Sequence, residues 1–351
     1  NVVITDATVV PEEAFYNCED ITSVTLNNEI KTIGTNAFKN CTKLESADIG
    51  TGVTAIDSDA FKNCSALKSM VLPSSVTEVG SSAFYGCSNM ASITLFNLTK
   101  INDYTFYNCS SLTGVTLPET LTEIGKYSFS GCVDLTGITI PKTVTRIGQS
   151  AFSGCTGITK LMLPDGMQTI EQEAFKNMQL QSIIVPNSVK SIGVGAFQGC
   201  PLESISLPFV GKSRDAVAYE AVFGYIFGYT TTAYSEYPYT SGGYLDGSKY
   251  RSNKSNEFVE IKVSSVGNAI WQYSCYSKYG KVGYIYSSRS NVYGYILESY
   301  LYYIPSTLTN VVITDATVVP EEAFYNCEDI TSVTLNNEIK TIGTNAFKNC
   351  T

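Results

Sequence analysis

The sequence predicts a β-solenoid, in which short units that repeat along the chain stack into one elongated hydrophobic core. The first observation is a 23-residue spacing at which apolar residues return to fixed positions: Val115 and Leu117, for example, come back as Ile138 and Ile140. The second observation is a phenylalanine that recurs at nearly the same spacing over most of the chain. A period of about 20–50 residues with fixed apolar positions is the sequence signature of a solenoid.

Each unit begins with a pattern that is typical of a short strand. Val115 and Leu117 alternate with Thr116, as they would in a strand with one buried face. Pro118 then ends the strand, because proline has no N–H group to donate to a neighbour. One unit alone has too little apolar surface to offset the entropy of ordering it. We therefore expect the strands of successive units to pair into a parallel sheet.

The second half of each unit predicts a chain reversal and a turn. Ile124 is placed for a second short extended or turn segment, and Gly125 supplies a backbone position at which the chain can reverse. Phe129 and Cys132 are three residues apart, which suits a single helical or 3₁₀ turn with both side chains inward. The unit is thus predicted to hold parallel strands, turns and a short helical or 3₁₀ segment.

The repeat divides the chain into three segments. Residues 1–208 carry an array of nine units, residues 209–308 break the period, and residues 309–351 start a second array. The phenylalanines of the first array are Phe15, Phe38, Phe61, Phe84, Phe106, Phe129, Phe152, Phe175 and Phe197. We expect all nine to point into one continuous core.

The insert, residues 209–308, is rich in tyrosine and mostly β in character. It holds 18 of the 24 tyrosines of the chain. Val259, Ile261 and Val263 alternate with polar residues, as in a strand, and residues 271–275 and 282–286 predict a hairpin around 278–280. Asp215 is placed to cap a short helix over residues 216–227.

The insert is also suited to cover the ends of the two arrays. Solenoid ends expose apolar surface and open strand edges, which aggregate unless they are capped. Large aromatic residues such as Phe223, Phe227 and Trp271 could provide that cover. We therefore predict that the insert is a capping joint, with polar residues 241–256 as its contact tip. A flexible linker is the alternative, although linkers are poor in such aromatic residues.

The chain then repeats itself without a single difference. Residues 310–351 are identical to residues 1–42, at an offset of 309 residues. A shared fold does not explain this identity, because surface positions tolerate change. Either the gene carries near-identical tandem blocks of about 309 residues, which we favour, or the sequence overlaps itself; both readings imply a longer repeating protein.

The unit resembles the repeat of a known family. Its pattern, Leu-x-x-Val-x-Leu-Pro-x-x-Val-x-x-Ile-Gly-x-x-Ala-Phe-x-x-Cys, looks like the 23-residue repeat of the BspA-like leucine-rich-repeat family, over residues 1–208 and 309–351. The resemblance implies a leucine-rich-repeat solenoid and a surface or secreted protein of bacteria or protists, associated with adhesion. Proline stands where most leucine-rich repeats place a bonding asparagine, so we do not expect an asparagine ladder.

The cysteines follow the repeat. Ten of the eleven occupy one position of the unit: Cys18, Cys41, Cys64, Cys87, Cys109, Cys132, Cys155, Cys200, Cys327 and Cys350. Disulfides between stacked neighbours are one reading, because their Cα atoms could fall within bonding range. We favour free buried thiols, because Met178 occupies the same position in one unit and the total is odd.

Composition argues against several classes of function. The net charge of −9 without a basic stripe speaks against nucleic-acid binding, and no apolar run reaches the roughly 18 residues of a membrane span. The chain has no histidine, which removes His-based catalysis and the commonest metal ligand. The chain also lacks a Cys-x-x-Cys pair, the spacing that would suggest a metal site. We predict that the protein is not an enzyme and that it binds no metal and no cofactor.

We therefore predict a non-enzymatic extracellular or cell-surface repeat protein, a structural stalk, filament or adhesin. Its partners would be a host or cell-surface protein, a glycan, or other copies of itself. The candidate ligand-binding residues all lie in the insert: Tyr237, Tyr239, Tyr244, Tyr250 and Trp271. The alternative is a receptor that binds a protein or glycan on the sheet face. That face is rich in Ser and Thr, and we expect the following segment to cover its small apolar patch at Met162 and Ile184.

Overall fold

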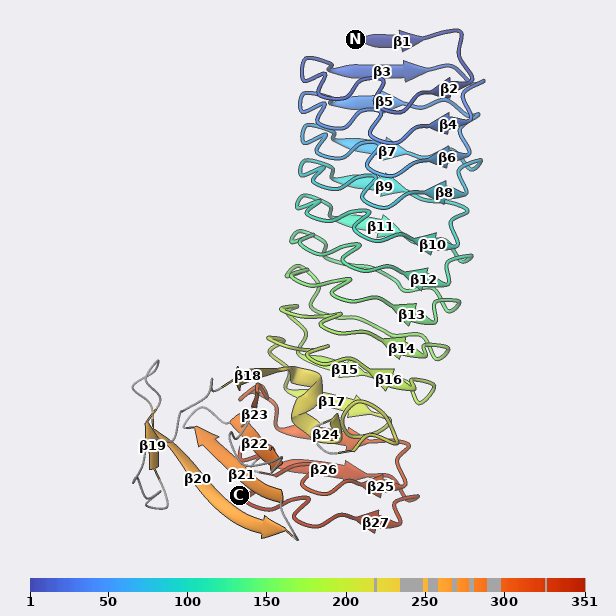
Figure 1. The fold of residues 1–351 in the computed structure, drawn as a ribbon. Coiled ribbons are helices and arrows are strands. Elements are labelled where there is room, and N and C mark those ends of the chain that lie inside the picture. The colour runs from blue at the N-terminus through green and yellow to red at the C-terminus, as the bar shows by residue number, and fades with distance from the viewer. Residues whose placement is uncertain are drawn as a thin grey trace.

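Two series of short parallel strands run the length of the molecule, one on each side of a narrow core (Figure 1). The computed structural model describes residues 1–217, 220–233, 249–251, 258–266, 270–277, 281–288, 298–325 and 327–350, with backbone only in the strands between 229 and 301. The chain forms about 12 solenoid turns at a spacing of roughly 23 residues. The predicted leucine-rich-repeat solenoid is therefore confirmed.

The first series consists of the strands predicted from the Val115 and Leu117 pattern. They pair in parallel and in register. Ile93, for example, lies between Met70 on one neighbouring strand and Val115 on the other. The strands are β1 (Val2–Ile4), β3 (Ser23–Leu26), β5 (Ser46–Asp48), β7 (Ser69–Val71), β9 (Ser92–Thr94), β11 (Gly114–Thr116), β15 (Ser182–Ile184), β17 (Ser204–Leu207), β24 (Asn310–Ile313) and β26 (Ser332–Leu335).

The second series is built on the aliphatic residue that precedes each phenylalanine by five positions. Each strand has two residues, and Ile124 pairs with Ile101 on one side and Ile147 on the other. The strands are β2 (Val9–Val10), β4 (Thr32–Ile33), β6 (Ala55–Ile56), β8 (Glu78–Val79), β10 (Lys100–Ile101), β12 (Glu123–Ile124), β13 (Arg146–Ile147), β14 (Thr169–Ile170), β16 (Ser191–Ile192), β25 (Val318–Val319) and β27 (Thr341–Ile342).

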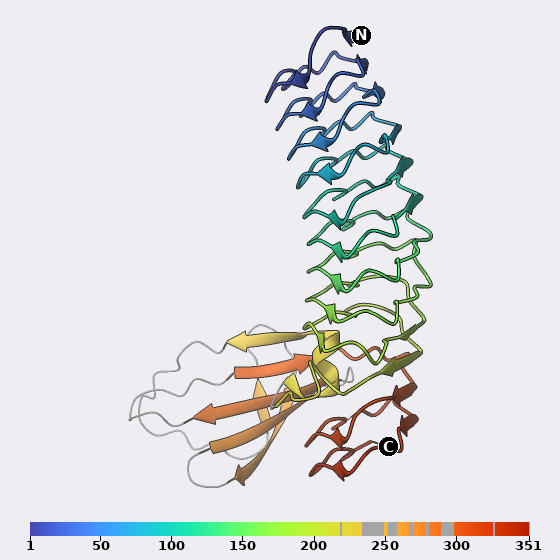
Figure 2. The same ribbon diagram turned by 90° about the vertical axis from the view of Figure 1, so that its right-hand side faces the viewer.

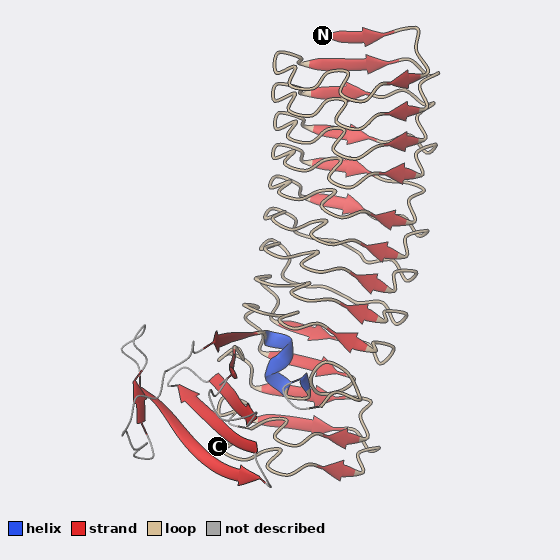
Figure 3. Ribbon diagram, viewed as in Figure 1, coloured by secondary structure: helices blue, strands red, loops and turns tan. Residues whose placement is uncertain are grey.

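Turns take the place of the short helical segments that the Phe and Cys spacing predicts (Figure 3). The Cys132 N–H does donate to the Phe129 carbonyl at 3.1 Å, as in one 3₁₀ turn. Tyr127 and Gly131 on either side of Phe129 have φ values of 54° and 78°. Because these left-handed positions interrupt the run, no helix can propagate through the unit.

The phenylalanines form the centre of the core. From Phe38 to Phe197 each ring is fully buried, whereas Phe15 is only partly buried. Successive rings are stacked, with centroids between 5.1 and 6.1 Å apart. The backbone of the same residues links the units, since the Phe129 N–H donates to the Ala151 carbonyl of the next unit at 2.8 Å.

The solenoid continues across the insert. β17 pairs directly with β24, in parallel, with Ser204 opposite Asn310 and Leu207 opposite Ile313. We call this pairing the junction. The edge that the insert was predicted to cap is therefore already occupied by a strand of the second array. The expected double cap is wrong at this point, because the insert leaves and re-enters the stack between two paired strands.

Residues 209–228 form an irregular turn of the stack. Ile192 and Phe197 donate backbone hydrogen bonds to Lys212 and Ile226, at 2.8 and 2.9 Å, and Phe223 donates to Ala323 at 2.8 Å. The segment ends in the 3₁₀ helix η2 (Phe223–Phe227). It begins after Val222 with no side-chain cap, and residues 216 and 217 are not helical, so the predicted helix over 216–227 with its cap at Asp215 is wrong.

The described strands of the rest of the insert form a separate six-stranded antiparallel sheet, which we call the side arm. Its strands are β18 (Tyr229–Ala233), β19 (Lys249–Arg251), β20 (Phe258–Val266), β21 (Ile270–Ser277), β22 (Lys281–Ser288) and β23 (Glu298–Tyr302). The predicted strand at 259–263 and the β21–β22 hairpin are present. Tyr229 pairs with Tyr302, so the chain leaves the solenoid and returns to it at the same place. Figure 2 shows the side arm projecting from the flank of the stack.

Candidate functional site

The outward face of the first strand series carries four exposed apolar residues, one of which is Val3 on β1, at 66% exposed. Val71, Met162 and Ile184 are 68%, 87% and 72% exposed. The expectation that the following segment covers Met162 and Ile184 is therefore wrong. The strands of the side arm pair with one another in a sheet of their own and do not cover this face.

Four tyrosines form a second surface feature at the turns that carry the buried phenylalanines. We call Tyr85, Tyr104, Tyr107 and Tyr127 the tyrosine ladder. Tyr85 stacks on Tyr107 at 4.8 Å and Tyr104 on Tyr127 at 4.9 Å between ring centroids, and Tyr104 lies 5.7 Å from Tyr107. Such aromatic pairs are stabilising beyond their buried area. The ladder joins three neighbouring turns into one half-exposed aromatic surface.

Polar groups flank the tyrosine ladder at both ends. The Lys62 ammonium lies 4.8 Å from the centroid of the Tyr85 ring, a cation–π contact, and Gln149 Nε2 donates to the Tyr127 hydroxyl at 3.2 Å. The pKa of the Tyr104 phenol is raised. The larger cause is partial burial among its neighbours, and the smaller one is the repulsion between a Tyr104 phenolate and the negative charges of Tyr127 and Asp103. The Tyr104 hydroxyl therefore stays a neutral hydrogen-bonding group at ordinary pH.

Charged residues of alternating sign run along the second strand series beside the ladder. Glu123 accepts from Lys100 at 3.2 Å and also pairs with Arg146. Arg146 pairs in turn with Glu171, whose second oxygen accepts from the Gln149 N–H at 2.9 Å. A connected network of half-buried charges orders a surface more than isolated exposed pairs do.

The cysteines of the array are free, as the sequence predicts. Cys41, Cys64 and Cys132 are buried and unpaired, and each Sγ donates to the carbonyl of the phenylalanine one unit back, at 3.1–3.2 Å. Burial raises the pKa of the Cys87 and Cys155 thiols to about 12. A neutral buried thiol is inert, so the buried thiols of this column act as core side chains.

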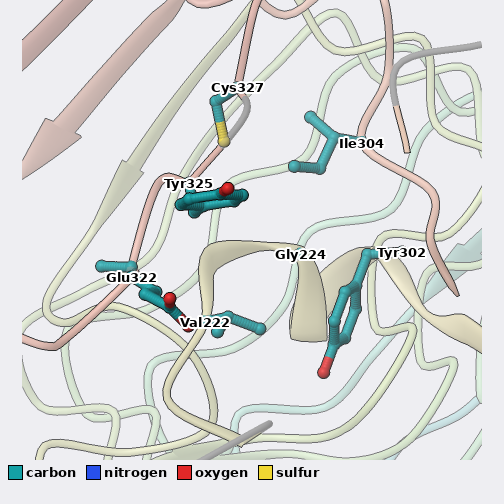
Figure 4. A pocket seen from close by; sticks show the side chains of 8 residues that line it. Val222, Gly224, Tyr302, Ile304, Glu322, Tyr325 and Cys327 are labelled. Carbon is teal, nitrogen blue, oxygen red and sulfur yellow. The ribbon is translucent and has the colours of Figure 1, made fainter. Parts of the chain in front are cut away.

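A small recess lies where the insert meets the second array (Figure 4). Its free volume for a water-sized molecule is about 0 Å³, and it is lined by Val222, Gly224, Tyr302, Ile304, Glu322, Ala323, Tyr325 and Cys327. Pockets for small ligands typically measure about 300–1,000 Å³. The recess is therefore a packing gap between η2 and the next turn of the solenoid and is too small to hold a substrate.

Comparisons with known proteins place the chain in a family. The model of the BspA type leucine rich repeat region matches in six copies, over residues 2–112, 99–215 and 295–351. The chain belongs to this family. The resemblance read from the 23-residue unit is thus confirmed. No curated protein matches the chain at a significant level.

Solved structures of other leucine-rich-repeat proteins are similar to the chain. A Bacteroides ovatus leucine-rich-repeat protein shares 25% identity at a TM-score of 0.62, covering 100% of this chain and 73% of the other. A T. pallidum leucine-rich-repeat protein has 29% identity and a TM-score of 0.42, and the match covers 43% of this chain and 72% of the other. The pneumococcal vaccine antigen PcpA has 26% identity and a TM-score of 0.42, and the match covers 53% of this chain and 51% of the other.

This leucine-rich-repeat chain has a partial asparagine ladder that the sequence reading did not expect. Asn40 Nδ2 donates to Asn17 Oδ1 at 2.8 Å, and Asn63 Nδ2 donates to Asn40 Oδ1 at 2.9 Å. These asparagines lie two residues after the phenylalanines, with φ near 60°, and not at the proline position. Asparagine tolerates this conformation, which frees its side chain to bond the next unit.

The candidate binding residues of the leucine-rich-repeat insert are placed only in part. Tyr237, Tyr239 and Tyr244 lie outside the described residues. Tyr250 lies on β19 opposite Val259, and Trp271 lies on β21 opposite Ser265. β20 separates these two strands, so the described backbone does not place Tyr250 and Trp271 side by side.

The tyrosine ladder was missed in the sequence although a signal was present. Tyr85 and Tyr107 each follow a buried phenylalanine, and Tyr104 and Tyr127 each precede one by two residues. Aligning those two columns would have found the ladder. Among the described residues there is no helix that could span a membrane and no group of three metal-ligating side chains.

Proposed function

We propose that the chain is a non-enzymatic extracellular repeat protein, a surface stalk or filament built from tandem blocks of about 309 residues that acts as an adhesin. Membership of the BspA-type family and the identity of residues 1–42 with 310–351 support this proposal. The observation that carries it is the pairing of β17 with β24. That pairing lets one block follow another without a break in the core.

We propose that the segments 1–208, 209–308 and 309–351 have different roles. The first and third provide the rod. Within the second, residues 209–228 join the rod and the side arm leaves from its flank, where Tyr229 pairs with Tyr302. Tandem blocks would then present side arms at regular intervals along a continuous stalk. Such multivalent display raises avidity without any new contact.

In this proposal the tyrosine-rich side arm and its loops contact the partner, a host or cell-surface protein or glycan. The residues assigned to that contact are Tyr237, Tyr239, Tyr244, Tyr250 and Trp271. Tyrosine and tryptophan are enriched at the centres of interfaces because they bring large rigid area with a polar group.

A receptor that uses its sheet face is the competing function, and one observation favours it. Val71, Met162 and Ile184 are apolar and exposed on the outward face of the first strand series. An apolar side chain held in water at a fixed place can mark a protein contact. In this alternative the side arm is a spacer and the rod itself binds.

Binding of the full chain to a glycan array and to host cells separates the two functions. The arm variant is Tyr237→Ser/Tyr239→Ser/Tyr244→Ser, the face variant is Met162→Ser/Ile184→Ser, and the ladder variant Tyr104→Ser/Tyr107→Ser is the control for a general loss of surface tyrosine. We expect at least a tenfold loss of binding in the arm variant alone. A loss confined to the face variant would establish the receptor instead, and wild-type binding in both would contradict both functions.

A further inference from the structure

The strands of the side arm pair in an unbroken register, so the backbone alone decides which residues share a face of the sheet. In each antiparallel pairing the partners follow one another without a bulge. Residues directly opposite each other lie on the same face, and so do residues two apart on one strand. Tyr284 on β22, for example, lies opposite Tyr300 on β23 and Ser274 on β21.

This register gathers tyrosines on one face of the sheet, which we call the tyrosine face. On β21, β22 and β23 its tyrosines are Tyr276, Tyr284, Tyr286, Tyr300 and Tyr302. Gln272 and Ser274 lie beside them on β21, opposite Tyr286 and Tyr284. The aliphatic residues of this face lie within two residues of a strand end: Val266, Ile270 and Val282.

The opposite face, which we call the aliphatic face, has a different composition. Its aliphatic residues are Val259, Ile261, Val263, Ile285 and Leu301. Antiparallel sheets commonly bury an aliphatic face and leave the polar one in contact with solvent. Tyr250 and Trp271, the two residues of the proposed contact that the backbone places, both lie on the aliphatic face, as Tyr273 does. We therefore expect these three residues to contribute to packing.

Tyr302 fixes the inner end of the tyrosine face. Its side chain is fully buried and packs on Gly224 of η2. From there β23 runs outward, and Tyr300 and Glu298 lie two and four residues farther along it, roughly 7 and 14 Å from Tyr302. Figure 2 shows these strands leading away from the stack. The tyrosines around Tyr284 and Tyr300 thus lie farther out along the side arm.

The charges of the tyrosine face favour an uncharged ligand. Glu298 is the only charged residue among the described residues of this face on β21, β22 and β23. The basic residues of the face lie on β19 and β20: Lys249, Arg251 and Lys262. Recognition of a sulfated, phosphorylated or sialylated ligand would need such residues clustered at the tyrosines.

We propose that the tyrosine face binds a neutral glycan, with Tyr284, Tyr286 and Tyr300 at the centre of the site. A sugar ring has an apolar C–H face and a rim of hydroxyls. Tyrosine supplies a flat apolar ring and a hydroxyl, and Gln272 and Ser274 supply amide and hydroxyl groups for hydrogen bonds. The inference rests on the proposed function, in which the side arm contacts the partner, and it selects the face and the class of ligand.

Two double variants of the full chain separate the faces, because each removes two tyrosines from the same sheet. The tyrosine-face variant is Tyr284→Ser/Tyr300→Ser, and the aliphatic-face control is Tyr250→Ser/Tyr273→Ser. The probe is an array of neutral oligosaccharides printed beside sialylated and sulfated ones. We expect the wild type to bind neutral members, and the tyrosine-face variant to bind them roughly tenfold or more weakly. The control should keep its binding but melt at a lower temperature.

A second measurement uses the wild type alone, so it does not depend on a variant folding. Tyrosines are nitrated with tetranitromethane, with and without the tightest-binding neutral oligosaccharide of the array, and the sites are mapped by peptide mass spectrometry. The sugar should slow nitration at Tyr284, Tyr286 and Tyr300. Tyr104 of the tyrosine ladder, which is 37% exposed, should react at the same rate in both samples.

Binding to sialylated or sulfated oligosaccharides only, or no protection of the three tyrosines from nitration, overturns the proposal. Equal loss of glycan binding in the two variants overturns it as well. Host-cell binding, measured on the same proteins, tests the adhesin role separately. Host cells bound without any neutral glycan bound would leave the adhesin role and overturn this inference. Neutral glycan bound on the tyrosine face without host-cell binding would support the inference and contradict the adhesin role.

Discussion

At the scale of single residues, each phenylalanine of the column connects neighbouring units in two ways. The ring stacks on its neighbours, and the backbone carbonyl accepts from the cysteine of the next unit, as Phe106 does from Cys132 at 3.2 Å. Phe129 is stacked at 5.2 and 5.4 Å between Phe106 and Phe152. A defect at one such position therefore removes contacts to both neighbouring units.

Phe129→Ala should reduce the free energy of unfolding by about 3–5 kcal/mol, because the ring is fully buried and its neighbours cannot collapse into the gap. Urea unfolding followed by circular dichroism measures the change. Tyr127→Ala, at a half-exposed position in the same turn, is the control, and we expect it to cost far less. Equal losses in the two variants would contradict the placement of the phenylalanine column in the core.

The cysteine column should make the fold sensitive to high pH. The pKa of the Cys87 and Cys155 thiols is about 12 in the folded chain, against an ordinary value of 9.0. The unfolded chain therefore loses its thiol protons first, so stability is full below pH 9 and falls as the pH rises from 9 toward 12. At pH 10 each such thiol should cost about 1.4 kcal/mol.

Urea unfolding at pH 8 and pH 10 under reducing conditions measures this loss. The control is Cys87→Ala/Cys155→Ala, which is less stable at both pH values but should lose less between them. A loss that is the same in the wild type and in this variant would show that other groups cause the pH dependence.

At the scale of elements, the sequence predicted the strands better than the turns. Most strand positions follow from the apolar pair of the unit, as at Val115 and Leu117, although the same pair at Ile138/Ile140 and Leu161/Leu163 forms no strand. The turns depend on left-handed residues such as Tyr127, which nothing in its residue type announces. The asparagine ladder was missed for the same reason, since it depends on the backbone conformation at Asn40 and Asn63.

The join between η2 and the side arm depends on a glycine. A Cβ atom added at Gly224 would lie 2.4 Å from Cβ of Tyr302, which is fully buried. Gly224→Ala should therefore displace η2 or Tyr302 and loosen the junction, seen as a lower Tm and faster proteolysis near residue 228. Gly114→Ala is the control, because a Cβ at Gly114 meets nothing within 4 Å. Equal behaviour of the two variants would show that the tight contact is not structurally important.

At the scale of the whole molecule, the loss of the period at residue 209 predicts the end of a stack. The structure shows that a stack can pass over such a break, because β18 and β23 pair antiparallel and return the chain to where it left. The entropy of closing a long insertion rises only slowly with its length. Sequence alone does not show whether the strands on either side of an insert pair, since pairing is a long-range contact.

The candidate site was less accessible to sequence reasoning than the fold. The 23-residue unit dictates which residues are buried, and it leaves the exposed positions free to vary. The tyrosine ladder becomes visible only once Tyr104 and Tyr107 are known to share a turn with the tyrosines of adjacent units. The residues of the side arm chosen from composition, such as Tyr250 and Trp271, stay a proposal that the binding experiment tests.

Disulfide trapping across the junction tests the continuity of the solenoid most directly. Ser206 on β17 lies opposite Val312 on β24, and Val312 lies opposite Thr334 on β26. In the full chain, Ser206→Cys/Val312→Cys should form an intramolecular disulfide under mild oxidation, because paired parallel strands lie about 4.8 Å apart. Ser206→Cys/Thr334→Cys, two strands apart, should not. Peptide mapping that finds no link between 206 and 312, or equal linkage in both variants, would contradict a continuous stack.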